Sequence, residues 1–235
     1  MKKPKIGIIG LGKMGSAIAR RLSGKGFSVN AWNRSCLTAE KKASLNIQIE
    51  RSIAGLSRWA DIIILSLSDD NAVETVLGEL CVRRLTNKLI VDTSTVRHTT
   101  LLENYKVIKS SGADAIDAPI SGWPKMIESG NAGIYIGGDQ RLVERFQPVA
   151  EVLSNRIVHV GKLGQGAAAK IVNNMMLASY WQSLKEAMQL GIKAGLGAES
   201  TLNILKNSPA ANGSLALKSD AILGKRDDVT FSVSG

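Results

Sequence analysis

The stretch from Lys5 to Leu22, KIGIIGLGKMGSAIARRL, constrains the fold most, because a short apolar run meets three glycines and then continues as an amphipathic helix. The pattern G-x-G-x-x-G occupies Gly10, Gly12 and Gly15. After a buried strand, the first glycine allows a tight turn, the second lets a phosphate approach the backbone, and the third lets the helix lie close to the strand. Free N–H groups and the helix dipole then face an anion. The stretch predicts a dinucleotide-binding unit.

The end of the next predicted strand, Phe27 to Trp32, indicates which dinucleotide fits. A site for NAD usually carries Asp or Glu about 20 residues past the glycines, where it binds the ribose hydroxyls. Here the strand is followed by Asn33, Arg34 and Ser35. A carboxylate would repel the additional phosphate of NADP, whereas an arginine with polar neighbours can bind it, so the sequence favours NADP over NAD. The alternative is a polar turn with a solvated arginine.

Further along the chain, short apolar runs alternate with helical patterns. Ile62 to Leu67 and Leu89 to Val91 read as buried parallel strands. This alternation predicts an α/β fold with a doubly wound, mostly parallel sheet. Ligands bind beyond the carboxyl ends of the strands in such sheets, and the residues on that side are Leu67, Ser68, Ser94 and Thr95. For Ser68 and Ser94, helix capping is an equally good explanation.

The segment from Asp114 to Gly138 reads as strand, loop, short helix and strand, and its loop is a candidate substrate site. Ser121 and Gly122 lie just past the predicted strand end, where backbone N–H groups and a hydroxyl can bind a carboxylate. A plain connection between two elements is equally compatible with this sequence.

The character of the chain changes after Gly166, where a long helical pattern without proline begins. We predict a dinucleotide-binding domain over residues 1–162 and a helical domain over residues 163–235. Lys170 lies in the apolar turn AAAKIVNNM, with Asn174 one helical turn later. Partial burial without a carboxylate partner would lower the pKa of this lysine from about 10.4 and make proton exchange feasible. A surface lysine is the commoner case, and spacing alone does not decide between the two.

Composition limits the remaining classes of function. The 235 residues carry a net charge of +10 with only 4% aromatic residues, which favours anionic small molecules over nucleic acid as partners. Cys36 and Cys81 are too few for a disulfide framework or a zinc site, and we expect no metal. No run reaches the roughly 20 apolar residues of a membrane span, and we expect a cytoplasmic protein. His98 and His159 are expected to be structural.

The motifs GLGKMGSAIARRL, WNRS, DTST, DAPISG and GQGAAAKIVNNM together resemble the β-hydroxyacid dehydrogenase family. This family includes 3-hydroxyisobutyrate dehydrogenases, tartronate semialdehyde reductases and glyoxylate/succinic semialdehyde reductases. The resemblance covers nearly the whole chain, and it implies a Rossmann-like sheet domain followed by an all-helical domain. It also implies a homodimer or a higher homo-oligomer.

By this resemblance, Lys170 is the catalytic acid/base and Asn174 assists it, while Ser121 and Gly122 bind the substrate carboxylate beside Trp123. Thr95 contacts the nicotinamide side, and WNRS is similar to the NADP-using branch. The full set of predicted cofactor contacts is Gly10, Leu11, Gly12, Lys13, Met14, Gly15, Asn33, Arg34, Ser35, Leu67, Ser68 and Thr95.

Three features depart from the family pattern. Trp123 stands where the pattern DAPVSGG has a second glycine, so a large side chain is expected near the substrate. His98 replaces an expected proline after DTST. The chain ends at FSVSG, where relatives continue for several more helices. We therefore expect an incomplete helical domain whose open apolar surface either contacts a partner chain or makes the protein less stable.

The first hypothesis is an NADP-dependent oxidoreductase that reduces a small aldehyde or keto acid to a hydroxy acid. A non-catalytic nucleotide-binding or scaffold protein derived from this family is the alternative, and Trp123 and the short C-terminus favour it. A third hypothesis, a nucleic-acid-associated adaptor on this fold, rests only on the net charge of +10.

Overall fold

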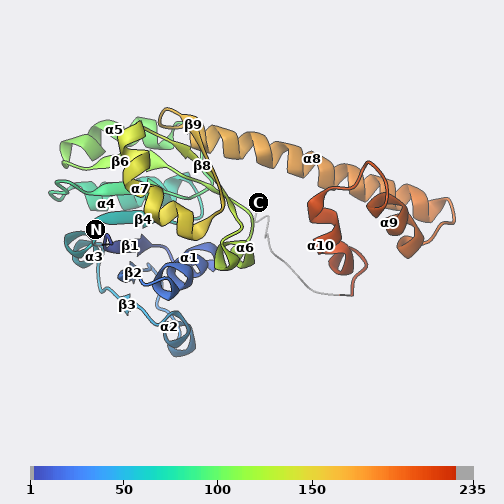
Figure 1. Ribbon diagram of the computed structural model, residues 1–235, viewed down its shortest axis with the longest axis horizontal. Coiled ribbons are helices and arrows are strands. Elements are labelled where there is room, and N and C mark those ends of the chain that lie inside the picture. Colours follow the sequence, from blue (N-terminus) through green and yellow to red (C-terminus); the bar gives the residue numbers. More distant parts are fainter. Residues whose placement is uncertain (1–2, 226–235) are drawn as a thin grey trace. The chain divides into compact units, whose positions relative to one another are not determined.

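A computed structural model describes residues 3–225 of the chain (Figure 1). The strands are β1 (Ile6–Ile9), β2 (Val29–Trp32), β3 (Gln48–Ile49), β4 (Ile62–Leu65), β5 (Leu89–Asp92), β6 (Asp114–Asp117), β7 (Ile120–Ser121), β8 (Gly133–Gly137) and β9 (Arg156–Gly161). The helices are α1 (Lys13–Gly24), α2 (Ala39–Leu45), α3 (Ile53–Trp59), α4 (Asp70–Cys81), α5 (Thr100–Ser110), α6 (Pro124–Ser129), α7 (Gln140–Leu153), α8 (Gln165–Lys193), α9 (Ala198–Lys206) and α10 (Gly213–Ile222).

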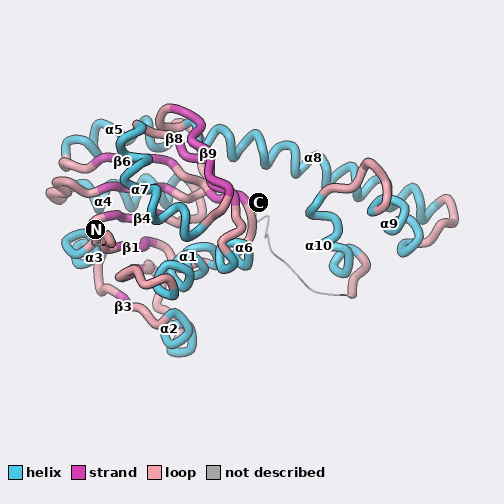
Figure 2. The backbone as a smooth tube through the Cα atoms, in the orientation of Figure 1, coloured by secondary structure: helices cyan, strands magenta, loops and turns pink. Residues whose placement is uncertain are grey.

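The strands form one sheet in the order β3-β2-β1-β4-β5-β6-β8-β7, with β9 paired to β8 (Figure 2). The pairs from β3 to β6 are all parallel, whereas β8 runs antiparallel to both β6 and β7. The strand order reverses next to β1: β2 and β3 follow on one side of β1, whereas β4, β5 and β6 follow on the other side. Ligands bind at such a switch point in doubly wound sheets. The predicted fold class is confirmed.

Two apolar layers cover the two faces of the sheet, because alternate residues of each strand point to opposite sides. Ile6 and Ile8 of β1 pack with buried residues of α1 and α7, whereas Ile9 packs with α3 and α4. The helices α1, α6 and α7 therefore lie on one face and α3, α4 and α5 on the other (Figure 1). The strands read as continuous apolar runs because both faces are buried.

The chain divides into two compact units after Val172, within the continuous helix α8. In the second unit, Leu184 and Met188 of α8 pack with Leu202 and Leu215 in a small core of its own. The predicted domain boundary after residue 162 stays a prediction, and the FSVSG end lies outside the described residues. Within residues 3–225, each helix is too short or too polar to cross a membrane.

Most predicted elements occur where the patterns indicated, with shifts at their ends. The predicted strand Ile62 to Leu67 stops at Leu65, and Ser66 and Leu67 already belong to the loop beyond the sheet. The predicted loop between Asp117 and the short helix contains the two-residue strand β7, which sequence patterns rarely reveal at this length.

Candidate active site

The glycine turn between β1 and α1 is built so that only Gly12 faces open space. A methyl group on Gly10 would meet the carbonyl oxygen of Ser66, and one on Gly15 would meet the carbonyl oxygen of Gly10. Gly10 also has a φ of +98°, which favours glycine. A methyl group on Gly12, by contrast, would have no atom within 4 Å. The first and third glycines thus serve the packing of the fold, and the second leaves room for a ligand.

Gly12 is also the N-cap of α1, and no side chain caps this helix. The first turn contains no acidic residue, so the positive end of the helix dipole is not offset by a side-chain charge there. Lys13 is exposed and Met14 is half-buried at the start of the helix. The turn therefore has the space and the polarity that a pyrophosphate requires.

The peptide units around Leu11 are fixed by side chains on both sides. The Leu11 N–H donates to Asn33 Oδ1 over 2.8 Å, and Asn33 Nδ2 donates to the Ser35 carbonyl over 2.9 Å. The Leu11 carbonyl accepts bonds from the Ser16 hydroxyl at 3.0 Å and from the Lys41 ammonium at 2.5 Å. Asn33 therefore positions the glycine turn, a role that its place after a strand did not predict.

Arg34 and Ser35 are exposed at the end of β2. Hydrogen bonds from the Ser68 hydroxyl and the Ala72 amide lower the pKa of Asp69, and the positive charge of Arg34 acts in the same direction. The electrostatic influence of Arg34 thus reaches the loop after β4. The influence of Arg34 on Asp69 agrees with the parallel pairing of β2 and β4 with β1, because this pairing brings the carboxyl ends of both strands to the same edge of the sheet.

The loops after β4 and β5 are joined by hydrogen bonds. The Leu67 N–H donates to Ser94 Oγ at 3.0 Å, and the Ser94 N–H donates to Asp92 Oδ1 at 2.9 Å. Ser68 donates to Asp69 Oδ2 at 2.6 Å, and Asp69 is the N-cap of α4. Neither Ser68 nor Ser94 caps a helix. Each bonds to a neighbouring loop residue instead, which differs from the helix-capping role considered in the sequence analysis.

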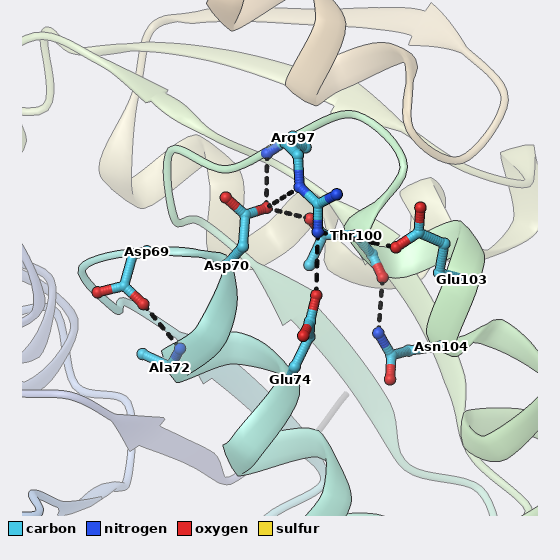
Figure 3. A network of polar contacts seen from close by, with 8 residues as sticks. All are labelled: Asp69, Asp70, Ala72, Glu74, Arg97, Thr100, Glu103 and Asn104. Carbon is cyan, nitrogen blue, oxygen red and sulfur yellow. Dashed lines mark hydrogen bonds and ion pairs between the residues drawn. The ribbon is translucent and has the colours of Figure 1, made fainter.

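A polar network around Asp70 connects α4 to the segment that leads into α5 (Figure 3). Asp70 Oδ1 accepts the Arg97 N–H at 2.9 Å and the Thr100 hydroxyl, and Arg97 Nη2 lies 3.1 Å from Glu74 Oε1. Burial alone would raise the pKa of Asp70, but the bonds from Thr100 and Arg97 lower it overall. The network anchors the loop that carries Thr95, which is exposed.

Two buried carboxylates lie side by side at the ends of β5 and β6, where Asp92 is in register with Asp117. Asp117 accepts the N–H groups of Gly164 and Ala167, each at 2.6 Å, and so fixes the start of α8. Burial raises the pKa of Asp117, and these backbone bonds oppose the rise. Neither aspartate was predicted as a site residue, although an aspartate at the end of an otherwise apolar strand is a signal that could have identified both.

Lys170 lies in the second turn of α8 and is only 7% exposed. Among residues 3–225, no side-chain or backbone acceptor forms a hydrogen bond or ion pair with its ammonium. Burial lowers the pKa of Lys170, and no opposite charge counters this effect. Asn174 follows four residues later on the same helix and is half-buried.

Ser121 ends β7 opposite Gly133 of β8, and Trp123 is the N-cap of α6. Between them, Gly122 has a φ of +141°, a conformation that favours glycine. The Trp123 carbonyl accepts the Met126 N–H at 2.8 Å, and Trp123 is half-buried. The three predicted substrate residues therefore form one rigid strand-to-helix corner.

The sequence matches known families along almost its whole length. Residues 5–161 match the NAD binding domain of 6-phosphogluconate dehydrogenase, and residues 164–234 match the family described as NAD-binding of NADP-dependent 3-hydroxyisobutyrate dehydrogenase. The chain is 34% identical over 229 residues to 2-(hydroxymethyl)glutarate dehydrogenase of Eubacterium barkeri, across 96% of this chain and 76% of that protein. The chain belongs to the β-hydroxyacid dehydrogenase family.

This β-hydroxyacid dehydrogenase is also 31% identical over 203 residues to glyoxylate/succinic semialdehyde reductase 1 of Arabidopsis thaliana, across 85% of this chain and 70% of that protein. Its fold matches that of Mycobacterium tuberculosis 3-hydroxyisobutyrate dehydrogenase with L-serine. The TM-score is 0.80 at 25% identity, over 97% of this chain and 90% of that chain. The family prediction is confirmed, and the protein is an NAD(P)-dependent dehydrogenase that acts on CH–OH groups.

His159 is structural, as predicted, because its Nε2 lies 2.9 Å from the carbonyl oxygens of both Gly138 and Gly161. His98 is exposed in the turn before α5. Within the described residues no cluster of three or more histidine, cysteine or acidic side chains could hold a metal ion.

Proposed function

We propose that this β-hydroxyacid dehydrogenase uses NADPH to reduce a small aldehyde or keto acid, with Lys170 as the general acid that protonates the carbonyl oxygen. The observation that carries the proposal is the side chain of Lys170, which is 7% exposed and whose ammonium has no hydrogen-bonding or charged partner among residues 3–225. A largely buried lysine without a charged partner is unfavourable, and such groups cluster at functional sites.

Residues of this chain would hold the cofactor at the glycine turn. Gly12 and the start of α1 would hold the pyrophosphate, and Arg34 with Ser35 would hold the additional phosphate of NADP. The absence of an acidic residue at positions 33–35 supports NADPH over NADH, because a carboxylate there would repel that phosphate. When bound, NADPH supplies the hydride for the reduction.

The substrate carboxylate would bind the corner formed by Ser121 and Gly122. In the reducing direction the Lys170 ammonium donates its proton to the carbonyl oxygen as the carbon accepts the hydride. In the reverse direction the neutral amine removes the proton from the hydroxyl. A lowered pKa suits this exchange, since a general acid works best when its pKa lies near the working pH.

We also propose a homo-oligomer. Large apolar side chains on α8 are highly exposed, with Met175 70%, Met176 69% and Leu190 70% exposed. Exposed apolar surface of this kind is typical of contacts between chains. Analytical ultracentrifugation of the protein would test this part of the proposal, and a monomer at micromolar concentration would contradict it.

Steady-state NADPH oxidation with glyoxylate, succinic semialdehyde and tartronate semialdehyde tests the reaction itself. Lys170→Met keeps an unbranched apolar stem but removes the charge, and we expect kcat to fall by roughly 100- to 10,000-fold, the usual contribution of a general acid. The dissociation constant of NADPH should stay the same. Lys185→Met, which changes an exposed lysine on the same helix, is the matched control and should retain full activity.

The pH profile gives a second test of the same residue. Because reduction needs the protonated ammonium and burial lowers the pKa of Lys170, kcat should fall as the pH rises through a value below 10.5. Full turnover by Lys170→Met would refute the catalytic role. Tight NADPH binding by the unaltered protein without turnover of any acid would instead favour a nucleotide-binding protein.

A further inference from the structure

We propose that Asp117 is a positioning residue for the reaction, because it fixes the start of α8 and with it the place of Lys170. The inference rests on the proposed role of Lys170 as the general acid. Asp117 is the last residue of β6 and is 3% exposed. The first amide that its carboxylate binds, that of Gly164, lies 47 residues later in the chain. Asp117 therefore acts across the fold and not on its own strand.

The first turn of α8 needs hydrogen-bond acceptors from outside the helix. Its first helical bond runs from the Ala168 N–H to the Gly164 carbonyl at 3.0 Å, so the preceding N–H groups have no helical partner. Asp117 Oδ1 accepts the Gly164 N–H and Oδ2 accepts the Ala167 N–H, each at 2.6 Å. The first turn carries no acidic residue, so Asp117 supplies the negative charge that the helix dipole favours at this end. A strand residue thus caps this helix.

The same turn is held against the sheet by a contact between two glycine backbones. A methyl group on Gly166 would lie 2.8 Å from the Gly137 nitrogen, and one on Gly137 would lie 2.6 Å from the Gly166 nitrogen. Gly137 belongs to β8 and is the partner of Asp117 in the sheet. Because Asp117 binds amides before and after Gly166, the carboxylate and this contact together fix the first turn of α8 against β6 and β8 (Figure 1).

Lys170 follows directly from this anchored turn. It lies three residues after Ala167, which places it on the same face of α8 and about 4.5 Å further along the helix axis. Its ammonium makes no hydrogen bond or ion pair within residues 3–225, so no polar contact of its own fixes the side chain. A shift of the first turn therefore moves Lys170 with it, and a displacement of about 1 Å can slow a reaction by roughly 100-fold.

The proposed substrate corner is attached to the sheet near the same residue. β6 ends at Asp117, and Ser121 of β7 follows four residues later. Between them, the Pro119 carbonyl accepts the Tyr135 N–H of β8 at 3.3 Å. The segment that leads to Ser121 is therefore tied to β8, as the start of α8 is. The bonds of Asp117 thus keep Lys170 in a fixed relation to the corner that would bind the substrate carboxylate.

The first test is Asp117→Asn, which keeps the shape of the side chain and replaces one acceptor with a donor. We expect kcat with the most active of the three aldehydes to fall by roughly 10- to 100-fold, because Lys170 is no longer held in place. The dissociation constant of NADPH should stay within about twofold, because the glycine turn is formed by β1 and α1. Asp114→Asn is the matched control. It removes a carboxylate of the same strand that pairs with Lys109 over 2.5 Å, and it should leave both values unchanged.

A double-mutant cycle with Lys170→Met gives a readout that a purely structural role would not change. Where the ammonium is already absent, Asp117→Asn has no general acid left to misplace. It should then change the single-turnover rate of NADPH oxidation by less than about twofold. A residue that only supports the fold would lower this rate by the same factor in both backgrounds. Saturating NADPH in the assay stabilises the folded state of every variant in the cycle.

Asp117→Glu is the second variant if Asp117→Asn does not melt cooperatively. It keeps the charge and both acceptor oxygens, and its side chain is longer by one carbon–carbon bond of about 1.5 Å, which displaces the helix start. The value of kcat should again fall by roughly tenfold or more, and the loss should again disappear in the Lys170→Met background. Full activity of Asp117→Glu would contradict a role in positioning.

The outcomes separate this inference from the proposed function. Equal losses with and without Lys170 would mean that Asp117 only supports the fold, and an unchanged kcat of Asp117→Asn would mean that it has no role in the reaction. Either result overturns the inference while leaving Lys170 as the general acid. Full turnover by Lys170→Met alone would overturn the proposed function, and the positioning role of Asp117 with it.

Discussion

Asp92, at the end of β5, allows a quantitative prediction of how much the burial of one carboxylate lowers the stability of the folded protein. Its side chain is 1% exposed, Oδ1 accepts the Ser94 N–H, and Oδ2 is buried without a hydrogen-bonding partner among the described residues. Burial raises the pKa of Asp92 to about 6, and the negative charges of Asp117 and Asp70 add to the effect of burial. Arg97 and His98 line the same small hollow. The substitution Asp92→Asn replaces the ionised carboxylate with a neutral side chain of the same shape.

The size of this effect on the free energy of unfolding follows from the pKa of Asp92. One pKa unit corresponds to about 1.36 kcal/mol, so a rise from 3.8 to about 6 makes ionised Asp92 about 3 kcal/mol less favourable in the folded protein than in the unfolded chain. Because the folded protein holds this proton more tightly, the contribution of Asp92 to stability falls as the pH rises from about 4 to about 6. Above that range the penalty is constant.

Thermal melting of Asp92→Asn and of the unaltered protein between pH 4 and pH 8 measures this penalty. The stability of the variant relative to the unaltered protein should increase by about 2.5 kcal/mol from pH 4 to pH 7, which corresponds to a relative gain of about 5–10 °C in Tm. The amide of the new asparagine lacks a partner, but that cost does not depend on pH. Asp117 titrates next to Asp92, so the transition belongs to the pair. A difference in Tm that does not change with pH would refute the reasoning.

The remaining predictions concern the glycine turn and the start of α8. Gly12→Ala should leave Tm unchanged because its methyl group enters open space, but it should weaken NADPH binding more than tenfold in a fluorescence titration. Gly15→Ala should instead destabilise the fold by about 1–3 kcal/mol because its methyl group collides with the Gly10 carbonyl, and an equal Tm for the two variants would contradict this. Asp117→Asn leaves one backbone N–H at the start of α8 without an acceptor, so we expect a loss of about 1–3 kcal/mol and faster amide exchange at Gly164 or Ala167. Unchanged exchange at both amides would count against this role of Asp117.

Local patterns in the sequence determined the type and order of the elements. The run Ile6 to Ile9 with the glycines after it predicts a strand, a turn and a helix, because periodicity and glycine conformation act within a few residues. The α/β fold class follows from the alternation of such units along the chain. The apolar turn around Lys170 did not decide whether this lysine is buried or on the surface, and the structure shows that it is buried.

Contacts between residues far apart in the chain were decided only by the tertiary structure. Lys41 reaches Leu11, Asp117 holds the amides of Gly164 and Ala167, and in each case at least 30 residues separate the partners. No local pattern encodes such pairs, because a side chain acquires its partner only when strands pair and helices pack against the sheet. The same packing excludes water from Asp92 and Lys170, and this exclusion of water changes their pKa values in opposite directions.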